Sequence, residues 1–235
     1  MKLINCDLGE CLAPDPDEVI MPLVDMANIA CGGHVGDHAS MEKAIKLAKQ
    51  HNVKVGAHPS YIDKENFGRI SYDISVETLF ESLLEQVTEF QRLCLQHDVE
   101  MHYIKPHGAL YHDMMNKPEV LAVLCQLIHA INPSLDLVVQ AGIRQQGMAA
   151  KSKQTAINFI YEAFADRAYR GNQLIPRSES GAMLNDAEDI VAQYQLLSQQ
   201  HTFTIDTICF HSDNPASVVA LTRIKVGLEQ DSLNV

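Results

Sequence analysis

The sequence of 235 residues has no tryptophan, few basic side chains and no long hydrophobic run. Lys and Arg number 18 against 30 Asp and Glu, which gives a formal net charge of -12. Nucleic-acid binding relies on clustered Lys and Arg that neutralise phosphates, so this balance argues against a nucleic-acid partner. No apolar run approaches the ~20 residues that a membrane span needs. We therefore expect neither nucleic acid nor a membrane as a partner.

Cysteine motifs are missing as well, because the six cysteines include no C-x-x-C pair. Several of them lie in apolar runs, where cysteine behaves as a small hydrophobic residue. The N-terminal stretch reaches Asn5 and Asp7 too early for the apolar segment of a secretory signal. These features predict a reduced protein that works in the cytoplasm.

Short apolar runs alternate with amphipathic stretches, which is typical of parallel strands joined by crossover helices. The chain is 46% hydrophobic, and α/β barrels of this length commonly form one domain, so we expect a single domain over residues 1–235. Seven strands are predicted, at Lys2 to Cys6, Asp25 to Cys31, Val53 to Ala57, Glu100 to Lys105, Leu135 to Gln140, Ala156 to Ala163 and Thr207 to Phe210.

Helix starts are marked by capping residues. The clearest predicted helix spans Val76 to Gln96 behind Ser75, with apolar residues at helical spacing. Asp37 precedes a second apolar stripe and is expected to cap it. Further starts are predicted behind Asn116, Asn185 and Asn214.

Polar residues gather where the predicted strands end. Nearly every strand is followed at once by His, Asp, Glu, Lys or Gly, which stability alone does not require. A β/α barrel concentrates its chemistry at the carboxyl ends of its strands, so we expect one shared site there. The candidates are Asp7, Glu10, Asn28, His34, Asp37, His58, Lys105, His107, Tyr111, Glu162, Asp166, Arg167, Arg177, His211 and Asp213.

Six blocks of sequence resemble the LamB/YcsF family. They are Asn5 to Glu10, Ala27 to Asp37, Gly56 to Tyr61, Lys105 to Tyr111, Ala163 to Arg167 with Pro176-Arg177, and Cys209 to Asp213. The resemblance implies a seven-stranded parallel β/α barrel of the glycoside hydrolase/deacetylase type. It also implies that the chain acts as the first of three components of a 5-oxoprolinase, together with 5-oxoprolinase subunits B and C. That complex couples ATP hydrolysis to the opening of 5-oxoproline to L-glutamate. Gly33 and Ser212 depart from the family pattern, which usually has Phe and Gly there.

Opening a lactam calls for cations, a base and an acid. Lys105, Arg167 and Arg177 are candidates for binding anionic oxygens, since arginine matches a carboxylate with two donors. The Asp7 and Glu10 carboxylates are candidates to orient or deprotonate water. The acid–base partners are expected among three histidines, whose unperturbed pKa of ~6.5 suits the task. These are His58, His107 and His211.

Two further signals concern cofactors. His34 and His38 have the i, i+4 spacing of two ligands on one helix face and, with Asp7, would resemble the metal triad of related deacetylases. Gly142 to Gly147 has the glycine spacing of a P-loop, but Met148 and Ala149 stand where Lys and Ser/Thr are required. We therefore expect ATP with Mg²⁺ to bind mainly on a partner.

Two alternative functions remain open from the sequence. A metal-dependent deacetylase of N-acyl sugars would use the histidine pair, although the lack of tryptophan counts against a sugar site. A binding or regulatory subunit without chemistry of its own is the other. A partner surface is expected among exposed apolar side chains around Tyr61, Tyr111 and Tyr169.

Overall fold

Seven parallel strands form a closed barrel in the computed structural model, which describes residues 2–142, 145–177 and 179–233. Neighbours in the barrel follow the order of the chain, and β9 closes it between β6 and β1. The strands are β1 (Leu3–Leu8), β2 (Met26–Ala30), β3 (Lys54–His58), β4 (Met101–Ile104), β5 (Asp136–Gln140), β6 (Phe159–Phe164) and β9 (Thr207–His211). The predicted seven-stranded parallel barrel is confirmed.

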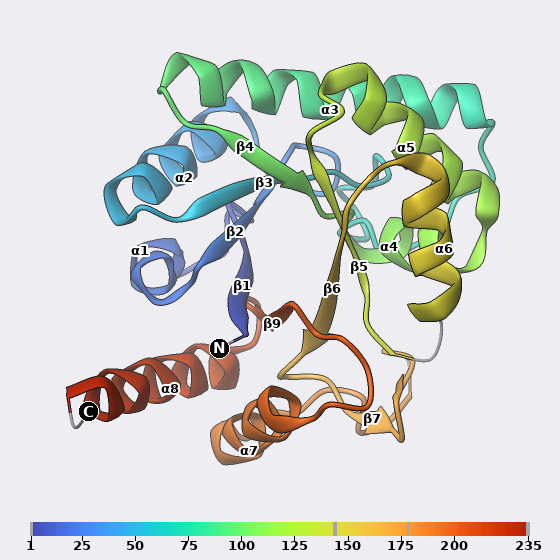
Figure 1. The fold of residues 1–235 in the computed structure, drawn as a ribbon. Helices are drawn as coiled ribbons and strands as arrows, with labels where there is room; N and C mark the ends of the chain where they lie inside the picture. The colour runs from blue at the N-terminus through green and yellow to red at the C-terminus, as the bar shows by residue number, and fades with distance from the viewer. Residues whose placement is uncertain (1, 143–144, 178, 234–235) are drawn as a thin grey trace.

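Helices surround the barrel and cover the outer faces of its strands (Figure 1). They are α1 (Asp17–Ile20), the 3₁₀ helix η1 (Met21–Leu23), α2 (His38–His51), α3 (Val76–Gln96), α4 (Gly108–Asn116), α5 (Pro118–Ile131), α6 (Gln145–Thr155), α7 (Ala187–Gln199) and α8 (Pro215–Leu233). A small hairpin that the sequence patterns did not reveal joins β7 (Tyr169–Arg170) to β8 (Gln173–Leu174). In the described parts of the chain, no helix combines the length and apolar character that crossing a membrane requires.

The two clearest helix predictions are confirmed with their caps. The Ser75 hydroxyl accepts a hydrogen bond from the Thr78 backbone N–H at the start of α3, and most of the apolar stripe of that helix, from Leu79 to Cys94, is buried. Asp37 caps α2 in a reciprocal arrangement with Ser40. The Asp37 carboxylate accepts from the Ser40 N–H, and the Ser40 hydroxyl accepts from the Asp37 N–H, so two free donors are satisfied.

The other predicted starts are partly wrong. Asn214 does accept from the Ala216 N–H at the start of α8. Asn116, however, is the last residue of α4, and Lys117 precedes α5. The cap of α7 is Asp186 rather than Asn185, because the Asp186 carboxylate accepts from two backbone N–H groups of the first turn.

The barrel interior changes character along its axis. Near the amino ends of the strands, Met26, Tyr103 and Val138 form an apolar layer. Gly56 makes room for this layer, since a Cβ there would lie 2.1 Å from the Tyr103 ring. Above it, Asn28 donates hydrogen bonds to Asn5 Oδ1 (2.8 Å) and Asp7 Oδ1 (2.7 Å). The interior thus becomes polar toward the carboxyl ends, where the candidate residues lie.

Candidate active site

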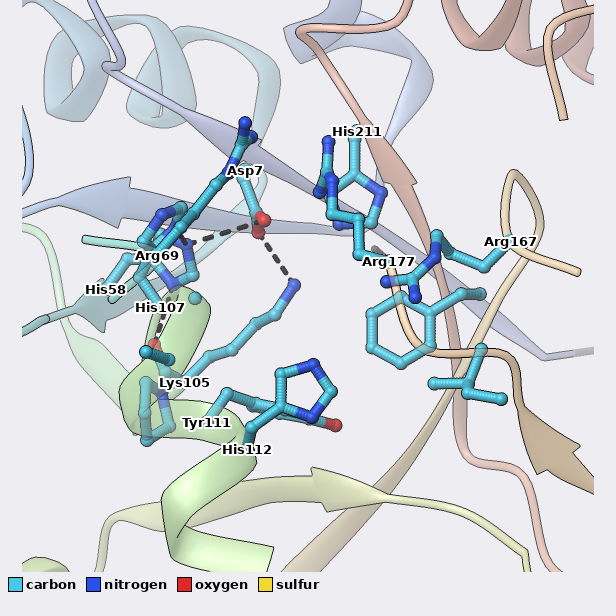
Figure 2. Close-up of a pocket in the computed structure, with 15 residues that line it drawn as sticks. Asp7, His58, Arg69, Lys105, His107, Tyr111, His112, Arg167, Arg177 and His211 are labelled. Carbon is cyan, nitrogen blue, oxygen red and sulfur yellow. Dashed lines mark hydrogen bonds and ion pairs between the residues drawn. The ribbon is translucent and has the colours of Figure 1, made fainter. Parts of the chain in front are cut away.

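A cavity of about 140 Å³ opens at the carboxyl ends of the barrel strands (Figure 2). This is small beside the ~300–1,000 Å³ of pockets for drug-sized ligands, so it suits a small metabolite. Eight of the predicted residues line it: Asp7, His58, Lys105, His107, Tyr111, Arg167, Arg177 and His211.

Lys105 lies at the centre of the cavity floor. Its Nζ is 2.7 Å from Asp7 Oδ1, 3.0 Å from Glu162 Oε1 and 3.2 Å from Cys209 Sγ. Burial acts to lower the pKa of Lys105, but the facing Asp7 carboxylate outweighs it and the pKa lies well above the ordinary value. Burial likewise acts to raise the pKa of Asp7, and its neighbours His58 and Lys105 hold it well below its usual range. The floor is therefore a buried ion pair at neutral pH.

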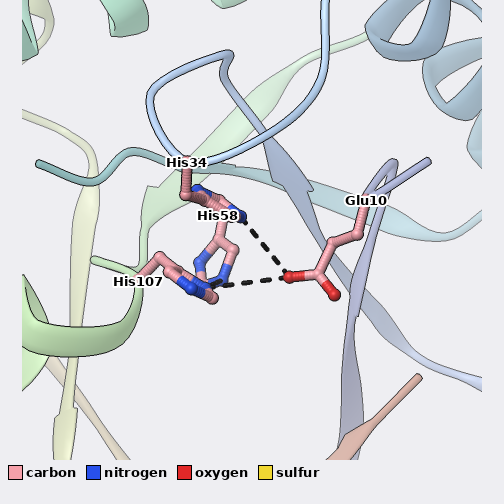
Figure 3. A group of neighbouring side chains, drawn as sticks. All are labelled: Glu10, His34, His58 and His107. Carbon is pink, nitrogen blue, oxygen red and sulfur yellow. Dashed lines mark hydrogen bonds and ion pairs between the residues drawn. The ribbon is translucent and has the colours of Figure 1, made fainter. Parts of the chain in front are cut away.

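One wall of the cavity is a cluster of three histidines beside Glu10 (Figure 3). The rings of His34 and His107 stack with centroids 3.6 Å apart, and His58 meets both edge-on. Burial and the neighbouring imidazoles lower the pKa values of His34 and His107 well below the ordinary value. Burial, aided by the charge of Asp7, raises the pKa of Glu10 to about 7. The rings of His34 and His107 therefore resist positive charge.

The loop after β3 packs closely against the three histidines. Gly68 has a φ of +65°, and a Cβ there would lie 2.8 Å from His34 Cβ and 3.0 Å from His107 Cδ2. Phe67 contacts the edges of both rings. Only a glycine at position 68 therefore lets the loop close over the histidines.

The opposite wall carries His211 paired with Asp166. His211 Nδ1 lies 2.8 Å from Asp166 Oδ1, and the same carboxylate accepts from the Ser217 hydroxyl. Burial acts to lower the pKa of His211, but Asp166 outweighs it and raises that pKa. The pKa of Asp166 is lowered by the charge of His211 against the effect of its own burial. Phe164 stacks on the His211 ring. This wall favours a protonated imidazole.

Three arginines surround the mouth of the cavity. Arg69 and Arg177 share the Asp213 carboxylate, at 2.5 and 3.2 Å. Arg167 is only 4% exposed and donates to the Ile175 carbonyl, while its Nε has no hydrogen-bond partner among the described residues. Although the chain as a whole is acidic, the mouth therefore offers positive charge and one unpartnered donor, Arg167 Nε, to a small anion.

Two sequence predictions are corrected here. Asp37 is an exposed helix cap outside the cavity, since its carboxylate is used by the α2 backbone. His38 is exposed and is the first residue of α2. Because His34 precedes the helix, the i, i+4 rule does not apply to this pair, and the predicted His34–His38 ligand set is wrong. His34 instead joins the histidine cluster.

The predicted partner surface around Tyr61, Tyr111 and Tyr169 stays a prediction. Tyr61 and Tyr111 are themselves buried, whereas Ile62 beside Tyr61 is exposed. Tyr61 donates to the Asp113 carboxylate inside the protein. Of the P-loop-like segment, residues 143 and 144 lie outside the described residues.

Several site residues were missed from the sequence. Asn5 and Cys209 contact Lys105 Nζ, and Arg69 lines the cavity. A signal existed for the first two, since residues two apart on a strand share a face and both precede a candidate by two positions. Gln86 had no such signal.

Gln86 explains how the chain accommodates Gly33. A Cβ at Gly33 would lie 2.4 Å from Gln86 Oε1 and 2.5 Å from Ser60 Oγ. The Gln86 amide accepts from the Ser60 N–H and donates to the Ser60 carbonyl, which holds it in place. The space beside Gly33 is thus filled by a residue from α3.

Comparison with known proteins agrees with this architecture. The profile of the LamB/YcsF family matches residues 3–235. The chain belongs to the LamB/YcsF family. A relative from Vibrio cholerae serotype O1 (strain M66-2), named as the A subunit of 5-oxoprolinase, is 38% identical over 97% of each chain. A protein of the same name from Staphylococcus aureus (strain bovine RF122 / ET3-1) is 35% identical, over 99% of this chain and 97% of its own.

A solved structure shares the fold as well. The crystal structure of a lactam utilization protein from Thermus thermophilus superposes with a TM-score of 0.83 and is 32% identical in sequence. The match covers 99% of this chain and 98% of that one. Relatives that match nearly the full length of the chain therefore carry names that refer to lactams or to 5-oxoprolinase.

Proposed function

We propose that this chain is the A subunit of an ATP-dependent 5-oxoprolinase and contains the site at which the lactam ring is opened. The names of its family relatives support the substrate. The structural observation that supports the proposal most directly is a small cavity with two basic residues. Buried Lys105 lies on its floor, and Arg167, whose Nε has no hydrogen-bond partner among the described residues, lies at its mouth. That arrangement fits a small molecule with one carboxylate and one amide carbonyl.

The substrate carboxylate binds at the mouth in this proposal. Arg167 supplies the free Nε donor, and its forked guanidinium matches a carboxylate with two parallel hydrogen bonds. Arg177 adds positive charge beside it. The lactam oxygen then points inward toward Lys105, whose ammonium stabilises negative charge that develops on that oxygen.

Ring opening needs an activated carbonyl because an amide is stabilised by resonance. In this proposal, ATP phosphorylates the amide oxygen and ADP leaves. A first water attacks the activated carbon and the C–N bond breaks, which leaves an acyl phosphate on the opened chain. A second water hydrolyses this acyl phosphate and releases glutamate and phosphate. Asp7, which lines the cavity, and Glu10, beside the three histidines, are the groups proposed to orient the water. The ring nitrogen takes up a proton as it departs, and His211, kept protonated by Asp166, is the proposed donor.

ATP and Mg²⁺ are proposed to bind mainly on the partner subunits B and C. The word "subunit" in the relatives' names supports a complex. The glycine-rich segment after β5 lacks the Lys and Ser/Thr of a P-loop, which supports a nucleotide site on another chain.

The test is glutamate release from 5-oxoproline with ATP and Mg²⁺ by the chain combined with its partner subunits. We expect Lys105→Met to lower kcat by about 10²–10³-fold, as does loss of one preorganised oxyanion donor. Lys46→Met is the matched control, because Lys46 is an exposed lysine on α2 paired with Glu42. No glutamate from the intact complex, or equal activity of the two variants, contradicts the proposal.

Substrate recognition is tested separately with Arg167→Lys. Loss of the forked guanidinium is expected to raise KM for 5-oxoproline by about tenfold, roughly the worth of one charge-assisted hydrogen bond. Arg92→Lys on the exposed side of α3 is the control. An unchanged KM in Arg167→Lys would place the carboxylate elsewhere.

A further inference from the structure

In the cluster of His34, His58 and His107, the hydrogen-bond partners determine which ring nitrogens carry a hydrogen. His58 Nδ1 lies 2.7 Å from the Lys105 carbonyl oxygen, and His107 Nε2 lies 2.9 Å from the Phe67 carbonyl oxygen. A carbonyl only accepts hydrogen bonds, so these two nitrogens carry the N–H groups. The remaining nitrogens, His58 Nε2 and His107 Nδ1, are 2.9 Å apart and both carry lone pairs in the neutral rings. Two lone pairs at that distance require a cation between or beside them.

His34 follows the same pattern. Its Nδ1 is 3.1 Å from the Ser60 hydroxyl oxygen, and that hydroxyl donates its single hydrogen to the Tyr61 carbonyl. The hydroxyl therefore accepts from His34 Nδ1, which leaves the lone pair on His34 Nε2. His34 is 1% exposed, and this Nε2 has no hydrogen-bond partner among the described residues. A third lone pair thus faces the same small volume.

Glu10 completes the group with a carboxylate oxygen. Its Oε1 lies 3.4 Å from His34 Nε2 and 3.7 Å from His107 Nδ1, neither of which has a hydrogen to donate to it. One ligand atom from each of the four buried residues lies within 4.8 Å of all the others. Two ligands about 2.0–2.1 Å from a tetrahedral Zn²⁺ stand roughly 3.3–3.4 Å apart, close to the spacings of Glu10.

We propose that Glu10, His34, His58 and His107 bind one divalent transition-metal ion of the Zn²⁺ class (Figure 3). Imidazole and carboxylate ligands suit such ions, whereas Mg²⁺ and Ca²⁺ take oxygen ligands. The acceptors behind the three rings orient the ligating nitrogens, as they do in known zinc sites. His58 and His107 also line the cavity, so the ion adjoins the substrate space.

The neighbouring group of Asp7, Cys209 and His211 is a poorer candidate. The Lys105 ammonium lies 2.7 Å from Asp7 Oδ1 and 3.2 Å from Cys209 Sγ, so a positive charge already occupies that place. A metal ion there would face direct repulsion from Lys105.

The test is calorimetric titration of the chelator-treated full chain with Zn²⁺, without 5-oxoproline or ATP. We expect saturation at one ion per chain, and Co²⁺ in its place to show the strong visible absorption of a tetrahedral site. His34→Phe and Glu10→Gln should each weaken Zn²⁺ binding at least tenfold. His38→Phe is the matched control, since His38 is exposed on α2, and its affinity should equal that of the unmodified chain.

Absence of saturable binding at one ion per chain would overturn the proposal, and would mean that a proton rather than a metal lies between the rings. Equal affinity in His34→Phe, Glu10→Gln and the unmodified chain would overturn it as well. If either substitution prevents folding, Ser60→Ala decides, because it removes only the acceptor that orients His34 and should weaken binding about tenfold. Since no substrate is present, failure here leaves the 5-oxoproline proposal standing.

Discussion

The two walls of the cavity use histidine in opposite ways. On one wall, His34 and His107 are buried against another imidazole, and their pKa values are lowered. On the other wall, His211 is slightly more exposed but contacts both oxygens of Asp166, and its pKa is raised. Burial disfavours the charged ring in all three. The partner decides the outcome, because a carboxylate in direct contact overcomes burial and a second imidazole adds to it.

The difference separates two kinds of chemistry within one cavity. A neutral imidazole presents a lone pair, which suits a ligand or a base, whereas an imidazolium presents a proton, which suits an acid. Lys105 lies between the walls and is paired with Asp7 and Glu162. Three of the four experiments below test this contrast, the fourth tests the loop that leads to α2, and they begin with the largest expected effect.

Asp166→Asn should remove the ion pair between His211 and Asp166. It removes one partner of a buried ion pair and leaves a buried imidazole without its carboxylate, so we expect a loss of about 3–5 kcal/mol in the free energy of unfolding, measured with urea. The control is Asp186→Asn at the α7 cap, where asparagine caps as well as aspartate and the change should stay within about 0.5 kcal/mol. If Asp166→Asn lowers the free energy of unfolding no more than Asp186→Asn does, the pair of His211 and Asp166 contributes little to stability.

We expect the pair of His211 and Asp166 to make the free energy of unfolding depend on pH. The pKa of His211 is raised on folding, so its contribution is fully present below the unfolded value of 6.5 and is lost as pH rises through the folded value. The pKa of Asp166 is lowered, so its contribution is present above the unfolded value of 3.8 and is lost as pH falls through the folded value.

Thermal melting from pH 6 to pH 9 checks this sign. The Tm difference between the unmodified chain and His211→Gln should shrink as pH rises through the folded pKa of His211. A difference that grows over this range would mean that His211 is neutral in the folded protein.

Asp37→Ala should show that the loop leading to α2 contributes stability rather than chemistry. Loss of an aspartate cap costs about 1 kcal/mol, which corresponds to roughly 2–4 °C in Tm for a domain of this size. The kcat and KM for 5-oxoproline should be unchanged, since Asp37 is exposed and lies outside the cavity. Changed kinetics with an unchanged Tm would return Asp37 to the substrate site.

The smallest effect is expected from His34→Phe in chelator-treated protein. The substitution keeps a ring that can stack on His107. It removes one neutral hydrogen bond, from His34 Nδ1 to the Ser60 hydroxyl, and a buried Nε2 that has no partner among the described residues. We expect the free energy of unfolding to change by no more than about 1 kcal/mol, in contrast to Asp166→Asn. A loss of about 3 kcal/mol or more in the metal-free chain would mean that the hydrogen bond from His34 Nδ1 to Ser60 contributes far more to stability than an ordinary one.

Much of the fold was readable from local patterns. The apolar runs of the seven strands and the helical stripe behind Ser75 depend on periodicity over neighbouring residues, and the structure has them nearly as predicted. Caps were less certain, because adjacent residues such as Asn185 and Asp186 both carry suitable oxygens and only the backbone path selects one. The prediction that His34 and His38 share a helix face was wrong for a related reason. The i, i+4 spacing places two residues on one face only when both lie in the helix, and His34 precedes it.

By itself, the sequence determined the strands and helices, their order and the placement of polar residues at the carboxyl ends of the strands, because strand and helix periods are local properties. The closed barrel was implied by the family resemblance. Only the tertiary structure decided which nitrogen of each histidine faces the cavity, which carboxylate meets Lys105, and that Gln86 fills the space beside Gly33. Hydrogen-bond direction, electrostatic pairing and steric room depend on atoms brought together from distant parts of the chain. Those distances cannot be read from a pattern of neighbouring residues in the sequence.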